Sequence, residues 1–204
     1  MASFSKMKKG FLFLQMVVFS ACYGQNSAQR TVEFYAQNIL PTKNGIVVRY
    51  DGRIEKADSS YNELAHLILV EFYRCKADPR GDNNDDLKID SDEWVELSMT
   101  IRKEVFISRP MFEGRLISPP NIKSRKNLKY KDLKGGFVRY YPKNLFHRVF
   151  PVKFNLTVEP IVSYNGSDYV WLKVSKNDLE YGSWYFFELN EQTVLDWCEI
   201  GWIQ

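Results

Sequence analysis

The chain has 204 residues, of which 45% are apolar, and carries 28 Lys and Arg against 25 Asp and Glu. Three of the cations, Lys6, Lys8 and Lys9, lie in a leader-like N-terminus, so the rest of the chain has 25 of each sign and is formally neutral. A neutral domain lacks the surplus cations that displace counterions from a phosphate backbone, which excludes the nucleic-acid-binding class.

The first residues have the layout of a secretory signal peptide. The three lysines precede an apolar run from Phe11 to Phe19, and small residues then close it. This run is shorter than the roughly 20 apolar residues that span a bilayer. We expect residues 1–24 to be a signal peptide and residues 25–204 to form a single exported domain.

Two processing routes fit the end of this leader. The sequence Phe-Ser-Ala-Cys ending at Cys22 is similar to a bacterial lipobox, in which the cysteine receives a lipid. Cleavage after Gly24 would instead leave Gln25 as the N-terminus. The first route predicts a membrane-anchored lipoprotein lipidated at Cys22, and the second predicts a periplasmic or secreted protein.

The N-terminal part of the domain contains two short segments with local signals. Residues 29–40 suit either a short helix or a strand. Residues 45–56 alternate apolar and polar side chains around Asp51-Gly52, a pair that favours a tight hairpin turn. We therefore predict a hairpin with this pair at its tip.

The next two segments favour strands. Residues 67–70 are apolar at every position, as in a central strand, so we predict a strand from Leu67 to Cys75; a helix is the alternative, because Ser60 and Glu63 fit a capping box. Residues 94–104 place apolar and polar side chains in strict alternation, which has the period of a strand. Residues 108–136, rich in Pro and Gly, predict an irregular connection with short edge strands.

The C-terminal part shows turn signals between aromatic and β-branched runs at strand spacing. Apolar residues alternate with polar ones over 153–159, and Asn165-Gly166 then predicts a type I′ hairpin turn. Further strands follow over residues 169–174, 183–189 and 193–203 as an antiparallel meander. The fold class predicted is mainly β, an antiparallel β-sandwich or partly open barrel with at most one or two short helices.

Cys75 and Cys198 are the two cysteines beyond the leader. In an oxidising compartment they are able to form one disulfide, and two separately buried thiols are the alternative. The spacing of the two residues leaves both arrangements open, since a bridge requires Cα atoms within about 7 Å.

A highly acidic segment runs from Asp78 to Glu93, with seven acids and two cations. Its oxygen-bearing side chains partly match the spacing of an EF-hand loop, although Leu87 replaces the glycine that such a loop needs and Pro79 breaks the preceding chain. The alternatives are a weak calcium site and a solvated or partner-binding loop. The candidate calcium ligands are Asp82, Asn84, Asp86, Asp90 and Glu93.

A basic stretch of opposite sign runs from Lys123 to Lys153, with ten cations and one acid. Clustered like charges steer the encounter with a partner more than they stabilise a fold. The alternative is a solvated face that balances the acidic segments. The residues expected to form a partner-binding basic patch are Lys123, Arg125, Lys126, Lys129, Lys131 and Lys134.

Catalytic motifs are scarce, and four tryptophans fall in the last 34 residues. The two histidines stand in no metal-binding spacing, and no serine lies in a nucleophile elbow, so no catalytic residue is assigned. An exposed coplanar set of indoles would indicate a carbohydrate-binding module or small glycan-acting enzyme. The tryptophans concerned are Trp171, Trp184, Trp197 and Trp202.

Together these patterns predict an exported, non-catalytic binding protein of the cell envelope. Its expected partner is a protein or an anionic envelope component, and no cofactor other than calcium is indicated. The alternatives are the carbohydrate-directed protein and an immunity-type protein that neutralises a partner.

Overall fold

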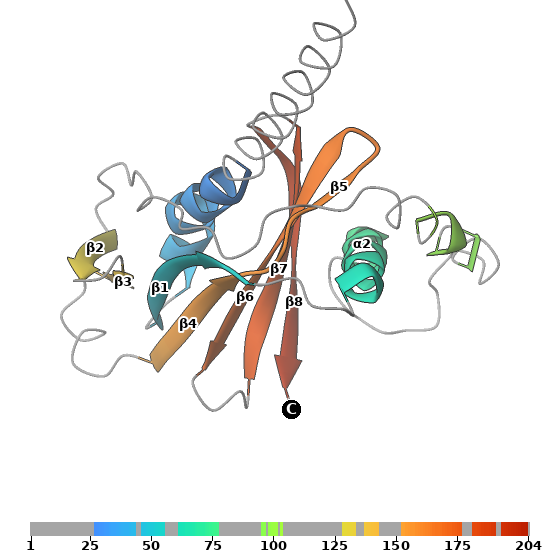
Figure 1. Cartoon of the computed structure of the whole chain (residues 1–204). Coiled ribbons are helices and arrows are strands. Elements are labelled where there is room, and N and C mark those ends of the chain that lie inside the picture. Colours follow the sequence, from blue (N-terminus) through green and yellow to red (C-terminus); the bar gives the residue numbers. More distant parts are fainter. Residues whose placement is uncertain are drawn as a thin grey trace, which may run out of the picture.

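In the computed structural model, the described residues form one mixed sheet with helices on both sides (Figure 1). The residues described are 27–43, 46–55, 61–77, 95–96, 98–101, 103, 128–133, 137–142, 152–176, 181–190 and 193–203. The mainly β class is confirmed, and the sheet stays open between β2 and β8, the ends of its strand order.

The sheet contains eight strands in the order β2-β3-β1-β4-β6-β7-β8, with β5 paired to β6. Neighbouring strands are antiparallel except β1 and β4, which run parallel and so require a long connection between them. The strands are β1 (Ile46–Ile54), β2 (Leu128–Leu133), β3 (Phe137–Pro142), β4 (Val152–Val158), β5 (Val162–Tyr164), β6 (Ser167–Lys176), β7 (Tyr181–Asn190) and β8 (Thr193–Ile203).

The C-terminal predictions are confirmed. Strands β6, β7 and β8 form the antiparallel meander. Asn165 and Gly166 take positive φ values of 48° and 77° and close the β5–β6 hairpin. Phe154, Leu156 and Val158 of β4 are buried while the residues between them are half-buried, as the alternation predicts.

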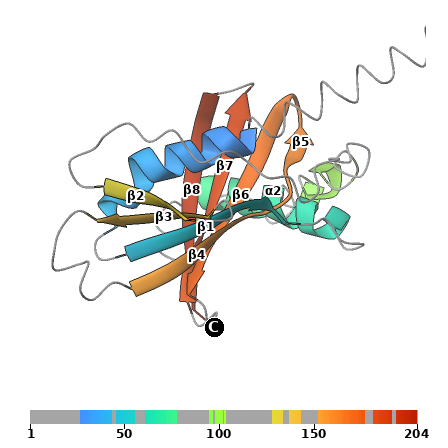
Figure 2. The same ribbon diagram turned by 60° about the vertical axis from the view of Figure 1, so that its left-hand side comes forward.

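An N-terminal helix covers one face of the sheet (Figure 2). Residues 27–34 are α-helical, a π-turn η1 (Tyr35–Ile39) and a 3-10 turn η2 (Leu40–Thr42) follow, and the helix alternative for this segment is therefore correct. The buried side chains recur at helical spacing, which produces one apolar stripe. They are Ala28, Val32, Tyr35, Ala36, Ile39 and Leu40.

The strand predicted from Leu67 to Cys75 is wrong, because α2 (Tyr61–Ala77) occupies this segment and packs on the opposite face of the sheet (Figure 1). Its buried residues Ile68, Leu69, Phe72 and Cys75 follow the helical period. A run that is apolar at every position fits a buried strand and a buried helix equally, and the run is part of a 17-residue helix.

The strand predicted over 94–104 is also wrong in the part described, where residues 95–96, 98–101 and 103 are helical. Apolar residues at every second position also stand at i and i+4, the spacing of one helix face. Ile101 is buried beside α2, whereas Val95 and Met99 lie exposed on another face. The helical content therefore exceeds the one or two short helices predicted.

The hairpin predicted at Asp51-Gly52 is a bulge inside the continuous strand β1. Gly52 has φ 79°, and the register between β1 and β4 shifts between Tyr50 and Ile54. The Arg53 backbone N–H donates to Asp51 Oδ1 at 3.0 Å and closes the bulge. A glycine with positive φ serves a bulge as readily as a turn, so the dipeptide alone does not distinguish them.

The buried hydroxyl of Tyr50 gives a test of the inner packing. Among the described residues no hydrogen-bond partner lies within reach of it, whereas the Tyr185 hydroxyl donates to Glu199 Oε1 at 2.8 Å. We predict that Tyr50→Phe raises the free energy of unfolding by about 1 kcal/mol and that Tyr185→Phe lowers it by about 2 kcal/mol. Urea titrations of both variants measure the two changes; a loss of stability in Tyr50→Phe would contradict this packing.

Candidate functional site

The outer face of the sheet, opposite the N-terminal helix, has a part beneath α2 and a part beyond α2 that carries exposed charges, which we call the open part. Helix α2 contacts β7 and β8 and buries the part beneath it. Over β1, β3 and β4 the same face carries polar side chains: Arg49 and Arg139 are exposed, and Asn155 and Thr157 are half-buried. This division follows from the strand period, because the residues next to Arg49, Val48 and Tyr50, point into the inner core.

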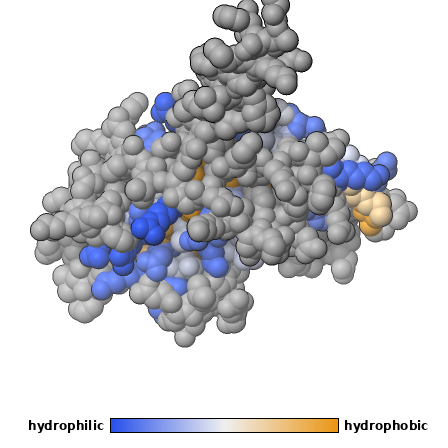
Figure 3. Space-filling model, in the orientation of Figure 1, coloured by the Kyte–Doolittle hydropathy of each residue, from blue (hydrophilic) through white to orange (hydrophobic). Residues whose placement is uncertain are grey.

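A row of cations crosses the open part. Arg49 of β1 stands directly opposite Arg139 of β3, and the register continues the row to Lys131 of β2. Lys153 at the start of β4 is a further exposed cation, paired with Val47 two residues before Arg49. Hydrophilic residues gather over β1 and β4 in Figure 3. We call Arg139, Arg49 and Lys153 the cationic row; the side chain of Lys131 lies outside the description.

Like charges directly opposite each other on neighbouring strands destabilise a sheet. The exposed residues Arg49 and Arg139 place two positive charges directly opposite each other on neighbouring strands. Violations of this kind are expected where a surface serves function more than stability. The cationic row is consequently the strongest candidate for a binding surface.

The row continues across the sheet into an aromatic cluster. Thr157 is paired with Lys173 of β6, and Lys173 with Trp184 of β7. The Trp184 ring meets Trp171 edge-on at 5.3 Å, and Trp171 stacks on Phe186 at 5.6 Å. This cluster joins the open part of the face to the core beneath α2.

A carboxyl group with altered acidity lies beside Lys173. Burial, and secondly the negative charge of Glu55, raise the pKa of Glu159 to about 6, while Lys173 opposes the rise. The Glu159 backbone N–H donates to the Trp171 carbonyl at 2.9 Å, which fixes the residue next to the aromatic cluster. Glu159 therefore changes charge in a weakly acidic range, at the end of the open face.

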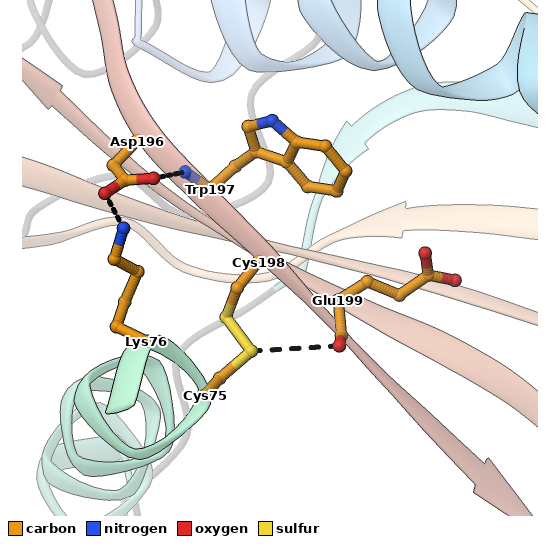
Figure 4. The surroundings of a disulfide bond; sticks show 6 residues. All are labelled: Cys75, Lys76, Asp196, Trp197, Cys198 and Glu199. Atoms are coloured by element: carbon orange, nitrogen blue, oxygen red, sulfur yellow. Dashed lines mark hydrogen bonds and ion pairs between the residues drawn. A yellow bond between two sulfur atoms is a disulfide. The ribbon is translucent and has the colours of Figure 1, made fainter. Parts of the chain in front are cut away.

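Of the two arrangements left open for Cys75 and Cys198, the structure has the disulfide, which joins α2 to β8 (Figure 4). The two Cα atoms lie 6.2 Å apart, within the range for such a bridge. One residue further along α2, Lys76 forms an ion pair with Asp196 of β8. The end of α2 is thus attached to the sheet by one covalent bond and one ion pair.

A second attachment holds the N-terminal helix on the inner face. Lys43, directly after η2, contacts Glu199 Oε2 at 2.6 Å, and Tyr185 donates to the same carboxylate. Burial raises the pKa of Tyr185, with Tyr35 and Glu199 adding to the rise, so Tyr185 keeps its proton as donor. Both carboxylate oxygens of Glu199 are engaged in this network, as in a structural anchor.

Several predicted site residues lie outside the described residues. These are the lipidation residue Cys22, all five candidate calcium ligands, and the basic-patch residues Lys123, Arg125, Lys126 and Lys134. Lys129 and Lys131 lie on β2. Within the described part of the chain no group of His, Cys, Asp and Glu forms a metal site, and no helix there has the length and apolar character to cross a bilayer.

The three described tryptophans of the C-terminal strands do not form a sugar-stacking plane. Trp171 and Trp184 lie on the outer face with ring planes 81° apart. Trp197 lies on the inner side, against Phe34 and Phe187. These three residues therefore do not form the coplanar set that would indicate sugar stacking. The side chain of Trp202 is outside the description, and the carbohydrate alternative, which also allowed tryptophans beside paired carboxylates, stays a prediction.

The predicted basic patch left out Arg139 and Lys153, which belong to the basic stretch, and Arg49 and Lys173, which lie outside it. Arg49 lies far from the basic stretch, and the β1–β3 pairing brings it beside Arg139. The alternation around Arg49 predicts that it faces outward, but no local pattern in the sequence shows which strand pairs with β1. Lys173 was likewise predicted only as part of a strand.

Comparison with known proteins finds no family model, no curated protein and no solved structure that matches this chain. The function is therefore inferred from the chemistry of the outer face.

The raised pKa of Glu159 predicts that folding stability depends on pH. The folded protein holds this proton more tightly than the unfolded chain, so raising the pH from about 4.5 to 6 removes up to about 2 kcal/mol of stability. We expect Glu159→Gln to be more stable than wild type at pH 7.5 and equal to it at pH 4, by urea titration.

The control for this measurement is Glu96→Gln, which removes the same charge from an exposed helical position. It should leave the pH dependence unchanged. Parallel stability profiles for wild type and Glu159→Gln would contradict the buried-carboxyl explanation.

Proposed function

We propose that this protein is an exported, non-catalytic binding protein whose outer sheet face holds an anionic partner of the cell envelope. The observation that carries the proposal is the exposed Arg49–Arg139 pair, two like charges placed directly opposite each other on neighbouring strands. Two positive charges held this close on an exposed face attract an anionic partner and orient it.

The shape of the surface favours a large partner over a small ligand. The cationic row extends over β3, β1 and the start of β4, so its charges spread across three neighbouring strands of the sheet. Exposed charges arranged in this way contribute mainly to encounter rate and orientation, and their effect falls as salt rises.

Export is supported by the leader-like N-terminus and by the disulfide. Structural disulfides are typical of oxidising compartments such as the periplasm and the cell exterior. The bridge closes a loop of 123 residues between α2 and the last strand. Lipid attachment at Cys22 would hold the binding face near the membrane, and the mass of the mature N-terminus distinguishes a lipidated Cys22 from a free Gln25.

Two immobilised probes test the binding face, poly-glutamate for an acidic protein and vesicles containing phosphatidylglycerol for an anionic lipid surface. We expect wild-type protein to bind at least one probe at low salt. Arg49→Glu with Arg139→Glu should weaken that binding by at least about tenfold, because it reverses the two central charges. Biolayer interferometry at 25 mM and 300 mM NaCl measures both effects.

The matched control is Arg74→Glu with Lys103→Glu, which changes the net charge equally at exposed positions on α2 and on the 95–103 helix. It should retain most of the binding. Equal losses in the two double variants would show a net-charge effect and refute a specific face, as would wild-type protein that binds neither probe.

A further inference from the structure

The start of the N-terminal helix is fixed to one end of the sheet. Ser27 Oγ donates to Asp168 Oδ2 at 2.5 Å, and Ser163 Oγ donates to Asp168 Oδ1 at 2.7 Å, so both carboxylate oxygens of Asp168 are engaged. Asp168 is the second residue of β6, next to the β5–β6 turn, and Ala28 belongs to the inner core. The described chain therefore begins on the inner side of the sheet, at the end that carries this turn.

The position of Ser27 limits where a lipid anchor can lie. Five Cα–Cα steps separate Ser27 from Cys22 along the chain. Because an extended chain spans at most about 3.6 Å per residue, a lipid on Cys22 holds Ser27 within roughly 18 Å of the bilayer surface. A lipidated domain is thus held at the membrane by the end of the sheet that carries the β5–β6 turn.

The outer face is too far from this anchor to lie flat on the same membrane. The sheet and α2 separate the N-terminal helix from the outer surface (Figure 1). Packed layers of secondary structure lie about 10 Å apart and a helix has a radius of about 5 Å, so Ser27 lies on the order of 25 Å from the outer surface of α2. That distance exceeds the reach of the link to Cys22.

The cationic row is also displaced from the anchor along the strands. Arg49 pairs with Asn155 and Asn155 with Ser175, which lies seven residues beyond Asp168 on β6. At about 3.3 Å per residue, Arg49 stands roughly 23 Å from the β5–β6 end. Lys153, near the start of β4, lies farther still from that end.

We propose that the lipidated protein faces the membrane with its β5–β6 end and holds the cationic row toward the water, so that the anionic partner of the row is an acidic protein and not the lipid of the anchor membrane. This inference rests on the proposed function, from which it takes the binding face and the lipid on Cys22. The bilayer is excluded by reach, whereas an acidic protein approaches the outer face from the water and is steered there by opposite charge. Such a protein offers carboxylates, which the planar guanidinium of arginine binds through two parallel hydrogen bonds.

Fluorescence quenching on vesicles that carry the lipidated protein tests the orientation. With Cys22 lipidated and Cys75 bonded to Cys198, a new cysteine supplies the free thiol for a dye. Asn190→Cys places the dye at the β5–β6 end, and Gly201→Cys is the matched variant at the opposite end of the sheet; both positions are exposed. A quencher on the lipid headgroups should reduce the Asn190→Cys signal at least about twofold more than the Gly201→Cys signal, because the second dye stands a strand length farther from the bilayer. Equal quenching, or stronger quenching of Gly201→Cys, would overturn the orientation.

Poly-glutamate binding to the anchored protein tests the partner class. The dissociation constant on vesicles containing phosphatidylglycerol should lie within about twofold of that on phosphatidylcholine alone, at 100 mM NaCl, where the charge of the bilayer is screened beyond about 10 Å. Arg49→Glu with Arg139→Glu should weaken the binding by at least about tenfold on both vesicles. Binding that phosphatidylglycerol weakens about tenfold would show that the bilayer occupies the row, and it would overturn the proposal.

The soluble variant Cys22→Ala separates this inference from the proposed function. A mature chain that starts at Gln25, or a Cys22→Ala chain that binds poly-glutamate when the anchored chain does not, would overturn the orientation and leave the binding face standing. A Cys22→Ala chain that binds phosphatidylglycerol vesicles but not poly-glutamate would overturn the acidic protein as partner. Binding to neither probe would refute the proposed function and this inference with it. Thermal unfolding of the two dye-labelled variants should match wild type, so that quenching reports position and not misfolding.

Discussion

The structure depends on one constraint: a central sheet with apolar residues on both faces must be covered on both sides. Consecutive residues of a strand point to opposite faces, so the aromatic run Tyr185-Phe186-Phe187 in β7 supplies buried rings to both cores at once. The N-terminal helix covers the inner face. On the outer face, α2 is anchored at its end by the disulfide to β8 and covers only the part over the last strands.

The open part of the outer face follows from this incomplete cover. Where α2 does not reach, the described strand residues include exposed Arg and Lys and half-buried Asn and Thr beside the buried Val47, and two of the arginines oppose each other. A solvated face needs polar side chains but does not need like charges in register. The binding function is proposed from these two opposed arginines. They lie on the part of the face that α2 does not cover, so the position of one helix determines where the charged surface is.

Patterns over a few residues correctly predicted the elements whose geometry depends on those residues alone. The Asn165-Gly166 turn, the alternating burial of β4 and the final meander follow from periods and turn residues over a few positions. Helix α2 and the 95–103 helix were mistaken for strands because their apolar spacing fits both structures and only the packing partner decides. Asp51-Gly52 forms a bulge and not a hairpin turn, because both ends of β1 pair with the same strand, β4. That strand lies about a hundred residues later, so its pairing has no local signal. The same long-range pairing assembles the cationic row. The basic stretch contains Arg139 and Lys153, whereas only the sheet pairing brings Arg49 beside them.

Hydrogen exchange with mass spectrometry, on the oxidised and the reduced protein, tests most directly whether two separately attached helices cover the two faces. Reduction of the Cys75–Cys198 bond should speed the exchange of the α2 amides by at least about tenfold and leave the amides of residues 27–34 unchanged, because local openings are independent where attachments are separate. Unchanged α2 exchange after reduction, or equal acceleration in both helices, would contradict this account.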